Sequence, residues 1–253
     1  MINLHDDPVL ITGGAGYIGS HAMLALLDSG CQTAVVDDLP TQWRSAVPND
    51  VPYYPGKAVD GALIGRVVAG RGCRAVTHFA GCIVVPGSVE LPLDYYQNNV
   101  VSSAELLRAC LDNGIERFVF STTVAVCDGE GSANVALSED AVQAPANSYG
   151  RSKLMTELML RDIAAATDLR VAVLCYYVTQ ALDVVDLVAK DMLGTEPMRR
   201  RPGARRASDP ASSTADTSRI WEALNWQPKY DDLAVMAATA LAWEKRLMNG
   251  IDG

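Results

Sequence analysis

The sequence predicts an α/β fold in which a doubly wound parallel sheet is followed by a small, mainly helical C-terminal part. Two patterns predict it. Over the first 178 residues, short strands that are apolar throughout alternate with helical segments, which is typical of a parallel sheet covered by helices. After residue 178 this alternation stops, and we expect no further strand. We therefore expect one large domain over residues 1–178 and a smaller, truncated C-terminal region over residues 179–253.

The expected strands are apolar runs bounded by turn residues. They lie at residues 9–12, 75–79, 117–121 and 170–176, and one more ends at Asp37. Helical patterns at about 17–28, 58–70, 93–113 and 147–166 fill the intervals. In the C-terminal region we expect helices over 181–193, from Thr217 or Ser218 to Leu224, and from Asp231 or Asp232 to about Met248.

Composition excludes several classes of function. The 253 residues include 21 basic and 30 acidic side chains, for a formal net charge of -9, which disfavours binding to nucleic acid or to an anionic membrane surface. No apolar run approaches the ~18 residues of a membrane-spanning helix, and the first residues carry Asp where a signal peptide carries Lys or Arg. The three His and six Cys do not cluster at metal-ligand spacing, so we expect no metal site. We expect a cytoplasmic protein.

A glycine-rich turn follows the first strand and opens the first helix. Gly13, Gly16 and Gly19 have the spacing that lets a backbone turn tightly and approach a pyrophosphate, whose charge the amide groups of the helix start then meet. Asp37 ends the next strand, where a carboxylate accepts hydrogen bonds from an adenosine ribose and repels a 2′-phosphate. This arrangement is typical of a Rossmann-type domain, and it predicts NAD rather than NADP as the cofactor.

A second motif predicts a catalytic base. Tyr149 and Lys153 stand four residues apart at the start of a helix and therefore share one face of it. An ammonium beside a phenol stabilises the phenolate and lowers its pKa, so we expect Lys153 to make Tyr149 a usable base. The hydroxyl groups of 121–123 follow the fourth expected strand and can bind the same substrate oxygen as Tyr149.

Five segments within residues 1–177 carry a resemblance to a known family. They read TGGAGYIGSH from residue 12, HFAG from 78, PLDYYQNNV from 92, FSTTVAV from 120 and SYGRSKLMTE from 148. The chain resembles the UDP-glucose 4-epimerases of the extended short-chain dehydrogenase/reductase family. Similarity resumes in ALDVVDLVAK (181–190), in 215–233 and in 240–247.

The resemblance implies a role for individual residues. The cofactor-binding residues would be Gly13, Gly16, Tyr17, Ile18, Gly19, Asp37, Asp38, Phe79, Ala80, Gly81, Asn99, Ser121, Tyr149 and Lys153. Tyr149, Lys153 and Thr123 would be catalytic, with Thr123, Arg206 and Asp209 binding a UDP-sugar. It also implies an isomerase that oxidises the sugar transiently at C4, and a homodimer formed through the helices at 93–113 and 147–166.

The chain departs from this family between Val178 and Ala181, where several tens of residues of the family pattern are absent. They include a last strand and helix of the NAD domain and most of the wall that grips the UDP-sugar. Two alternatives to an active C4 epimerase therefore stay open. One is an NAD-binding remnant that has lost turnover; the other is a different member of the family, a reductase or a dehydratase of nucleotide sugars. The dehydratase is disfavoured because Val124 and Ala125 stand where it carries an acidic pair.

Overall fold

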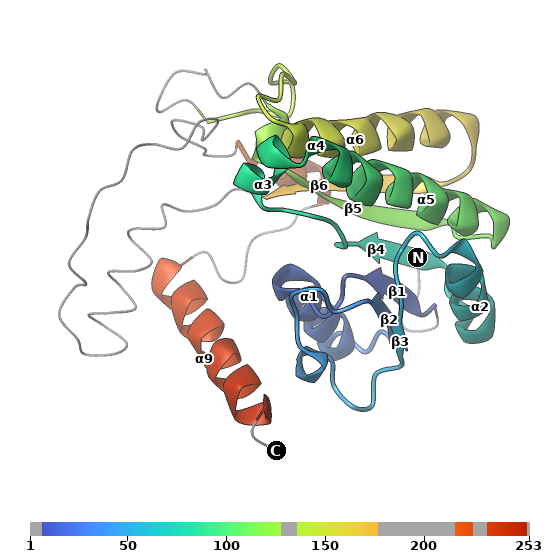
Figure 1. Ribbon diagram of the computed structural model, residues 1–253, viewed down its shortest axis with the longest axis vertical. Helices are drawn as coiled ribbons and strands as arrows, with labels where there is room; N and C mark the ends of the chain where they lie inside the picture. Colours follow the sequence, from blue (N-terminus) through green and yellow to red (C-terminus); the bar gives the residue numbers. More distant parts are fainter. Residues whose placement is uncertain (1–6, 128–135, 177–215, 225–231, 252–253) are drawn as a thin grey trace. The chain divides into compact units, whose positions relative to one another are not determined.

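The computed structural model describes residues 7–127, 136–176, 216–224 and 232–251 (Figure 1). The chain forms two compact units: Met1–Val126 with Pro145–Tyr176, and Cys127–Ala144 with Tyr177–Gly253. The predicted boundary at residue 178 treats 127–144 as part of the first domain, whereas the structure groups that segment with the C-terminal residues. A hydrogen bond from the Asp216 amide to the Leu137 carbonyl, at 2.9 Å, contributes to this grouping.

A six-stranded parallel sheet forms the centre of the first unit; the sequence analysis predicts a parallel sheet there, from five of these strands. Its strands are β1 (Val9–Thr12), β2 (Thr33–Asp37), β3 (Tyr53–Pro55), β4 (Ala75–His78), β5 (Arg117–Thr123) and β6 (Arg170–Tyr176). They lie in the order β3-β2-β1-β4-β5-β6. The sequence analysis missed β3, because its three residues end in a proline and are too short for a recognisable pattern.

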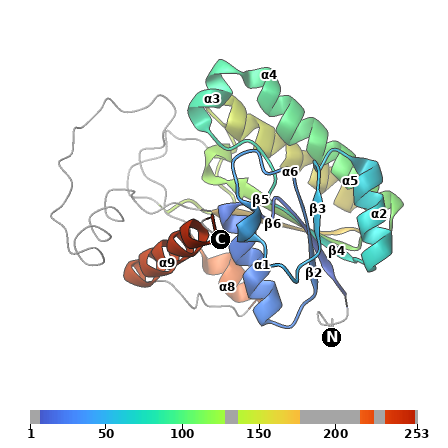
Figure 2. The same ribbon diagram turned by 60° about the horizontal axis from the view of Figure 1, so that its bottom comes forward.

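Helices cover the sheet on both faces (Figure 1, Figure 2). They are α1 (Tyr17–Asp28), α2 (Gly61–Arg71), α3 (Val85–Glu90), α4 (Pro92–Tyr95), α5 (Ser102–Asp112) and α6 (Ser148–Ala166), with 3-10 turns η1 (Arg44–Ala46) and η3 (Val124–Val126). The connection from β1 through α1 leads to β2, toward the β3 edge of the sheet. The connections through α2, α5 and α6 lead toward the β6 edge. Because such crossovers are right-handed, α1 lies on one face and the other three on the opposite face.

The helix predicted over 93–113 is interrupted. A π-helical turn, η2 (Tyr96–Val101), stands between α4 and α5. A π-turn adds one residue to a helical turn and changes which side chains face the protein interior. Within η2 only Asn99 is buried, whereas α5 buries a regular stripe of apolar residues. The apolar pattern therefore predicts a helix here but does not reveal the extra residue.

The main hydrophobic core lies between the sheet and the face covered by α2, α5 and α6. Its fully buried side chains include Leu10, Val36, Val76, Phe118 and Phe120 from the strands and Ile64, Leu106, Leu107 and Leu160 from the helices. Truncating a buried side chain of this size costs about 2–5 kcal/mol. This core fixes α6 against β5, and these two elements carry the predicted catalytic residues.

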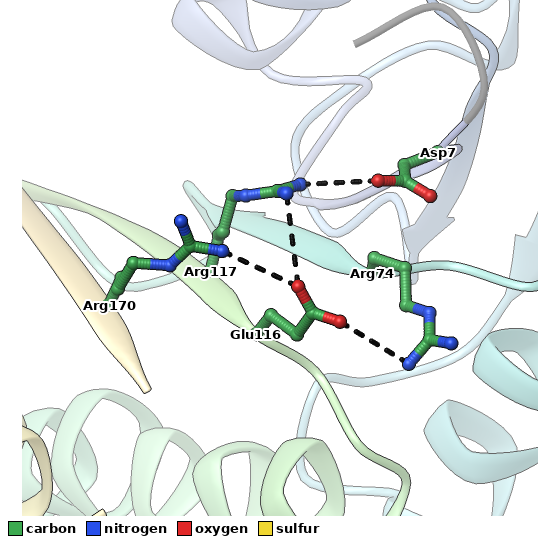
Figure 3. A network of polar contacts seen from close by, with 5 residues as sticks. All are labelled: Asp7, Arg74, Glu116, Arg117 and Arg170. Carbon is green, nitrogen blue, oxygen red and sulfur yellow. Dashed lines mark hydrogen bonds and ion pairs between the residues drawn. The ribbon is translucent and has the colours of Figure 1, made fainter. Parts of the chain in front are cut away.

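An ion-pair network joins the amino ends of the last three strands (Figure 3). Glu116 lies 3.5 Å from Arg74, 3.8 Å from Arg117 and 3.4 Å from Arg170, measured between nitrogen and oxygen atoms. Arg117 also pairs with Asp7 at 3.4 Å. Because these residues precede or begin β4, β5 and β6, the network lies at the opposite end of the sheet from the strand ends that carry the predicted site.

β6 is the last strand of the sheet that the structure describes, and β5 is its partner along all seven residues. The segment that the sequence analysis finds missing after Val178 includes the strand that would follow β6 in the family pattern. The helix predicted over 181–193 lies outside the described residues, so it remains a prediction.

The described part of the second unit contains two helices. α8 (Ser218–Leu224) and α9 (Leu233–Ile251) confirm the helices expected there. The Asp232 carboxylate accepts hydrogen bonds from the amides of Ala234 and Val235, so Asp232 caps α9 as predicted. Arg219 of α8 pairs with Glu139 at 3.0 Å. Among the helices of the described ranges, none has the length and apolarity needed to cross a membrane.

Candidate active site

The glycine-rich turn lies where the strand order reverses. β1 stands between β2 and β4, so the chain leaves β1 in one direction and returns past it to β4. In sheets of this kind, ligands bind at such a switch point, beyond the carboxyl ends of the strands. The turn after β1 and the loop after β4 meet there, because the amides of Phe79 and Ala80 donate to the Thr12 carbonyl at 2.9 and 3.1 Å.

The turn itself fits a dinucleotide. Gly13 has φ +74°, and a Cβ on it would lie 2.5 Å from the Ala80 nitrogen. A Cβ on Gly19 would lie 2.2 Å from the Gly13 carbonyl oxygen, so the turn closes only with glycine. Gly16 begins α1 without a side-chain cap, and the first turn of the helix has no acidic residue. The amide groups there suit the pyrophosphate of NAD.

Asp37 lies beside this turn, as predicted. Its side chain is buried and accepts hydrogen bonds from the amides of Ala15 at 3.0 Å and Leu39 at 2.9 Å. These bonds fix the carboxylate at the end of β2, where it can meet the adenosine ribose. Asp38 is more exposed and pairs with Lys57 at 3.9 Å. Tyr17 and Ile18, at the start of α1, expose 51% and 43% of their surface and are open to a ligand.

The predicted catalytic residues come together at the carboxyl end of β5. Thr123 is hydrogen-bonded to the Tyr149 side chain, and Lys153 Nζ donates to the Ser121 carbonyl at 2.9 Å. Lys153 also lies over the Phe120 ring, 4.8 Å from its centre. Asn147 starts α6 by accepting a hydrogen bond from the Gly150 amide, which places Tyr149 and Lys153 in the first two turns.

The electrostatics of Tyr149 and Lys153 differ from the expectation. We expected Lys153 to lower the pKa of Tyr149, but burial raises the pKa of Tyr149, and the hydrogen bond with Thr123 opposes this only in part. Burial also lowers the pKa of Lys153 to about 8, while the Glu157 carboxylate acts in the opposite direction. Both groups are more than nine-tenths buried, so desolvation of their charged forms is the dominant effect.

Asn99 holds the loop after β4 against α6. Its side chain accepts from the Cys82 amide at 2.8 Å and donates to the Cys82 carbonyl and to Ser152 Oγ, both at 3.0 Å. Gly81 stands between Asn99 and Lys153, because a Cβ on it would lie 3.0 Å from Asn99 Oδ1 and 3.8 Å from Lys153 Nζ. Asn99 and Gly81 therefore lie next to Lys153, the predicted catalytic lysine.

Sequence reasoning missed two residues of this arrangement. Ser152 connects Asn99 to the Tyr149 carbonyl, to which its hydroxyl donates at 2.7 Å. Glu157 is buried on α6 and accepts a hydrogen bond from Thr122. The available signal for Glu157 was its position four residues after Lys153, which places it on the same helix face. Ser152 carries no comparable signal in the sequence.

Other predicted residues lie outside this description. Arg206 and Asp209, expected to bind the UDP-sugar, fall in a range that the structure does not describe. Within the described ranges, no group of three or more His, Cys, Asp or Glu side chains is placed to hold a metal ion.

Comparison with known proteins identifies the family. A family model described as "NAD dependent epimerase/dehydratase family" matches residues 9–179. A UDP-glucose 4-epimerase of Azospirillum brasilense is 34% identical over 327 residues, covering 96% of this chain and 93% of that protein. Among solved structures, the UDP-glucose 4-epimerase from Brucella ovis in complex with NAD is similar with a TM-score of 0.78 and 26% identity, over 91% of this chain and 96% of that one.

The comparisons also bear on the missing segment. The alignment with the Azospirillum brasilense protein has 327 positions, and at least 74 of them, the difference from the 253 residues here, have no counterpart in this chain. A UDP-glucose 4-epimerase of Rhizobium meliloti is 38% identical over 174 residues, which is 69% of this chain but 52% of that protein. The family match ends at residue 179, close to the predicted deletion. The chain belongs to the NAD dependent epimerase/dehydratase family, which confirms the family and the cofactor that the sequence predicts.

Proposed function

We propose that this protein is an NAD-dependent isomerase that inverts C4 of a UDP-sugar, with UDP-glucose and UDP-galactose as the first candidates. The observation that carries the proposal is the hydrogen bond between Tyr149 and Thr123 beside buried Lys153, at the switch-point end of the sheet. Support for the substrate class comes from the relatives, which are named UDP-glucose 4-epimerases.

In the proposed reaction, bound NAD supplies a reversible hydride acceptor. Tyr149 Oη takes the proton of the sugar 4-hydroxyl as C4 is oxidised, and it returns this proton when the sugar is reduced on its opposite face. Thr123 orients the phenol and binds the same sugar oxygen. Lys153, fixed by the Ser121 carbonyl, holds its positive charge beside the place where negative charge develops on oxygen. The proton and the hydride are both returned, so no net oxidation occurs.

The direct test is proton NMR of UDP-galactose incubated with the purified protein and excess NAD⁺. We expect the anomeric signal of UDP-glucose to appear and to be absent with Tyr149→Phe. Tyr54→Phe is the matched control, because Tyr54 lies on β3, at the far edge of the sheet from Tyr149. A folded, NAD-loaded protein that leaves UDP-galactose unchanged would contradict the proposal.

That negative outcome would favour the second candidate, an NAD-binding protein without turnover. The observation in its favour is the set of at least 74 positions that the relative has and this chain lacks.

If the protein is active and Arg206 and Asp209 bind substrate, as the resemblance implies, Arg206→Ala should raise KM for the UDP-sugar and leave NAD affinity unchanged. Appearance of NADH with a UDP-sugar would instead support the reductase alternative.

We also propose a homodimer formed through the exposed face of η2 and α6. Val101 of η2 and Met155 and Leu158 of α6 are apolar and expose 41%, 42% and 43% of their surface, and η2 packs against α6. Sedimentation velocity should give a dimer for the unmodified chain and a monomer for Met155→Glu with Leu158→Glu. A monomer at all concentrations of the unmodified protein would contradict this proposal.

A further inference from the structure

Three consecutive residues at the carboxyl end of β5 bind three residues of α6. The Ser121 carbonyl accepts from Lys153 Nζ, the Thr122 hydroxyl donates to Glu157 Oε1, and the Thr123 side chain is bonded to Tyr149. On α6 the three partners follow one another at intervals of four residues and so share one helix face. The proposed reaction uses the first and the third of these contacts but assigns nothing to the second.

The second contact is buried and charged. Glu157 exposes 7% of its surface and Thr122 5%. Burial of a carboxylate is costly unless hydrogen bonds and an opposite charge compensate it. Thr122 supplies a hydrogen bond, and Lys153, which is 4% exposed and one turn earlier on the helix, supplies the charge.

We propose that Glu157 is a positioning residue that keeps the Lys153 side chain charged and directed at the end of β5. It does so in two ways. Its negative charge stabilises the Lys153 ammonium inside the protein. Its hydrogen bond with Thr122 fixes β5 between Ser121, which Lys153 contacts, and Thr123, which Tyr149 contacts. This inference rests on the proposed function, because it assigns a role to Glu157 in the same site.

The charge of Lys153 depends on a balance between neighbouring groups. Burial lowers the pKa of Lys153 to about 8, and Glu157 raises it. His78 on β4 faces Lys153. Burial lowers the pKa of His78 to about 3, so His78 carries no charge in the folded protein at neutral pH. Tyr149 lies on α6 itself, and Tyr95 on α4 and Cys175 on β6 act on Tyr149. Of these groups, Glu157 is the one that opposes the loss of charge on Lys153.

The test measures Lys153 directly. The chain has only five lysines, at positions 57, 153, 190, 229 and 245, so protein labelled with ¹³C at lysine Cε gives few signals, and Lys153→Arg assigns the one that matters. We expect the midpoint of the Lys153 titration to fall by about 1 pH unit in Glu157→Gln, the effect of removing one nearby opposite charge. Glu105 is a half-buried residue on α5 that pairs with Arg108, so Glu105→Gln removes the same charge elsewhere and should leave the midpoint unchanged.

The same change predicts a pH-dependent loss of activity. Near pH 8 about half of Lys153 is charged in the unmodified protein and about a tenth in Glu157→Gln, so turnover should fall about fivefold there and little near pH 6. An equal loss at every pH would indicate a structural role only and would overturn the proposal. Glu157→Asp keeps the charge and should restore most of the alkaline activity.

The NMR titration needs no turnover, so it separates this inference from the proposed function. If UDP-sugars are not converted but the Lys153 midpoint falls in Glu157→Gln, the inference stands and the proposed reaction does not. An unchanged midpoint in folded Glu157→Gln overturns the inference whatever the activity. If that variant does not fold, Thr122→Val gives the second test: it removes a hydrogen bond that holds the carboxylate, and an unchanged Lys153 midpoint in it also contradicts the proposal.

Discussion

Thr123, the last residue of β5, is hydrogen-bonded to the Tyr149 phenol on α6, and this bond is the contact that lowers the pKa of a tyrosine which burial otherwise raises. The phenol must lose its proton to act as a base. The bond therefore both aims Tyr149 and favours the ionised form that the proposed reaction needs.

Thr123→Val should raise the pKa of Tyr149 and lower turnover. We expect kcat to fall about 10²-fold near neutral pH, with the acidic limb of the pH–rate profile moved to higher pH. Thr123→Ser keeps the hydroxyl and should recover most of the rate. A valine variant whose profile matches that of the unmodified protein would show that the hydroxyl does not act on Tyr149.

The glycine turn should tolerate no side chain at Gly19. A Cβ there would lie 2.2 Å from the Gly13 carbonyl oxygen, and that atom is backbone and cannot move aside cheaply. Gly19→Ala should weaken NAD binding, measured by calorimetry, by tenfold or more, and lower Tm. Gly70→Ala is the matched control: it lies in α2 with nothing within 4 Å of an added Cβ, and it should stabilise the protein by about 0.5–1 kcal/mol. Equal NAD affinity in the two variants would contradict the fit of this turn to a dinucleotide.

His78 should make the protein sensitive to acid. It is buried between Thr12, whose hydroxyl lies 2.6 Å from Nδ1, and Ser103, whose hydroxyl lies 3.0 Å from Nε2. Burial lowers its pKa in the folded state to about 3, below the ordinary value of 6.5. The unfolded chain therefore takes up a proton first, and the free energy of unfolding falls as pH drops from about 6.5 toward 3.

The limiting slope from this one group is about 1.4 kcal/mol per pH unit. Urea unfolding of His78→Asn, which keeps a polar side chain beside Thr12 but has no group that titrates in this range, should show a shallower loss of stability. A slope as steep as that of the unmodified protein would assign the acid sensitivity to other groups.

The network around Glu116 should contribute to stability and not to the site. Glu116→Gln leaves Arg74, Arg117 and Arg170 close together without the carboxylate they share (Figure 3). We expect a loss of about 1 kcal/mol at low ionic strength, smaller in high salt, because these side chains are partly exposed and screened. Thermal unfolding measures it, and NAD affinity should not change. A large effect on NAD binding would contradict this prediction, because it would show that the network at the amino ends of the strands influences the site at their carboxyl ends.

Much of the fold could be predicted from the sequence because strong local signals mark it. Asn147 caps α6 within one residue of the expected helix start, and the apolar runs of β1, β5 and β6 lie where predicted. Thr123, Tyr149 and Lys153 lie together as expected, because Thr123 ends β5 and the other two stand in the first two turns of α6, while their catalytic roles stay a prediction. What could not be predicted depends on contacts between distant residues.

Two of those contacts illustrate the limit. Asn99 binds Cys82, 17 residues away, only because η2 turns it inward, and an apolar pattern cannot show an extra residue in a helix. Thr122 binds Glu157 across 35 residues, and neither side chain belongs to a recognisable motif. The pKa of Tyr149 was predicted in the wrong direction because the sequence shows which charges are near but not how completely the protein excludes water.

The π-turn also constrains how this segment can change in length. A π-turn holds one more residue than an α-helical turn, so deleting one residue within Tyr96–Val101 would convert η2 to regular helix and leave α4 and α5 facing as they do now. The apolar stripe of α5 would stay on the core, and the change in side-chain direction would fall on the turn that contains Asn99. The protein would then fold with the loop after β4 released from α6. Insertions and deletions in η2 would therefore disrupt the site and leave the rest of the fold intact. A related protein that folds but has lost activity should be checked for a single-residue deletion in this turn.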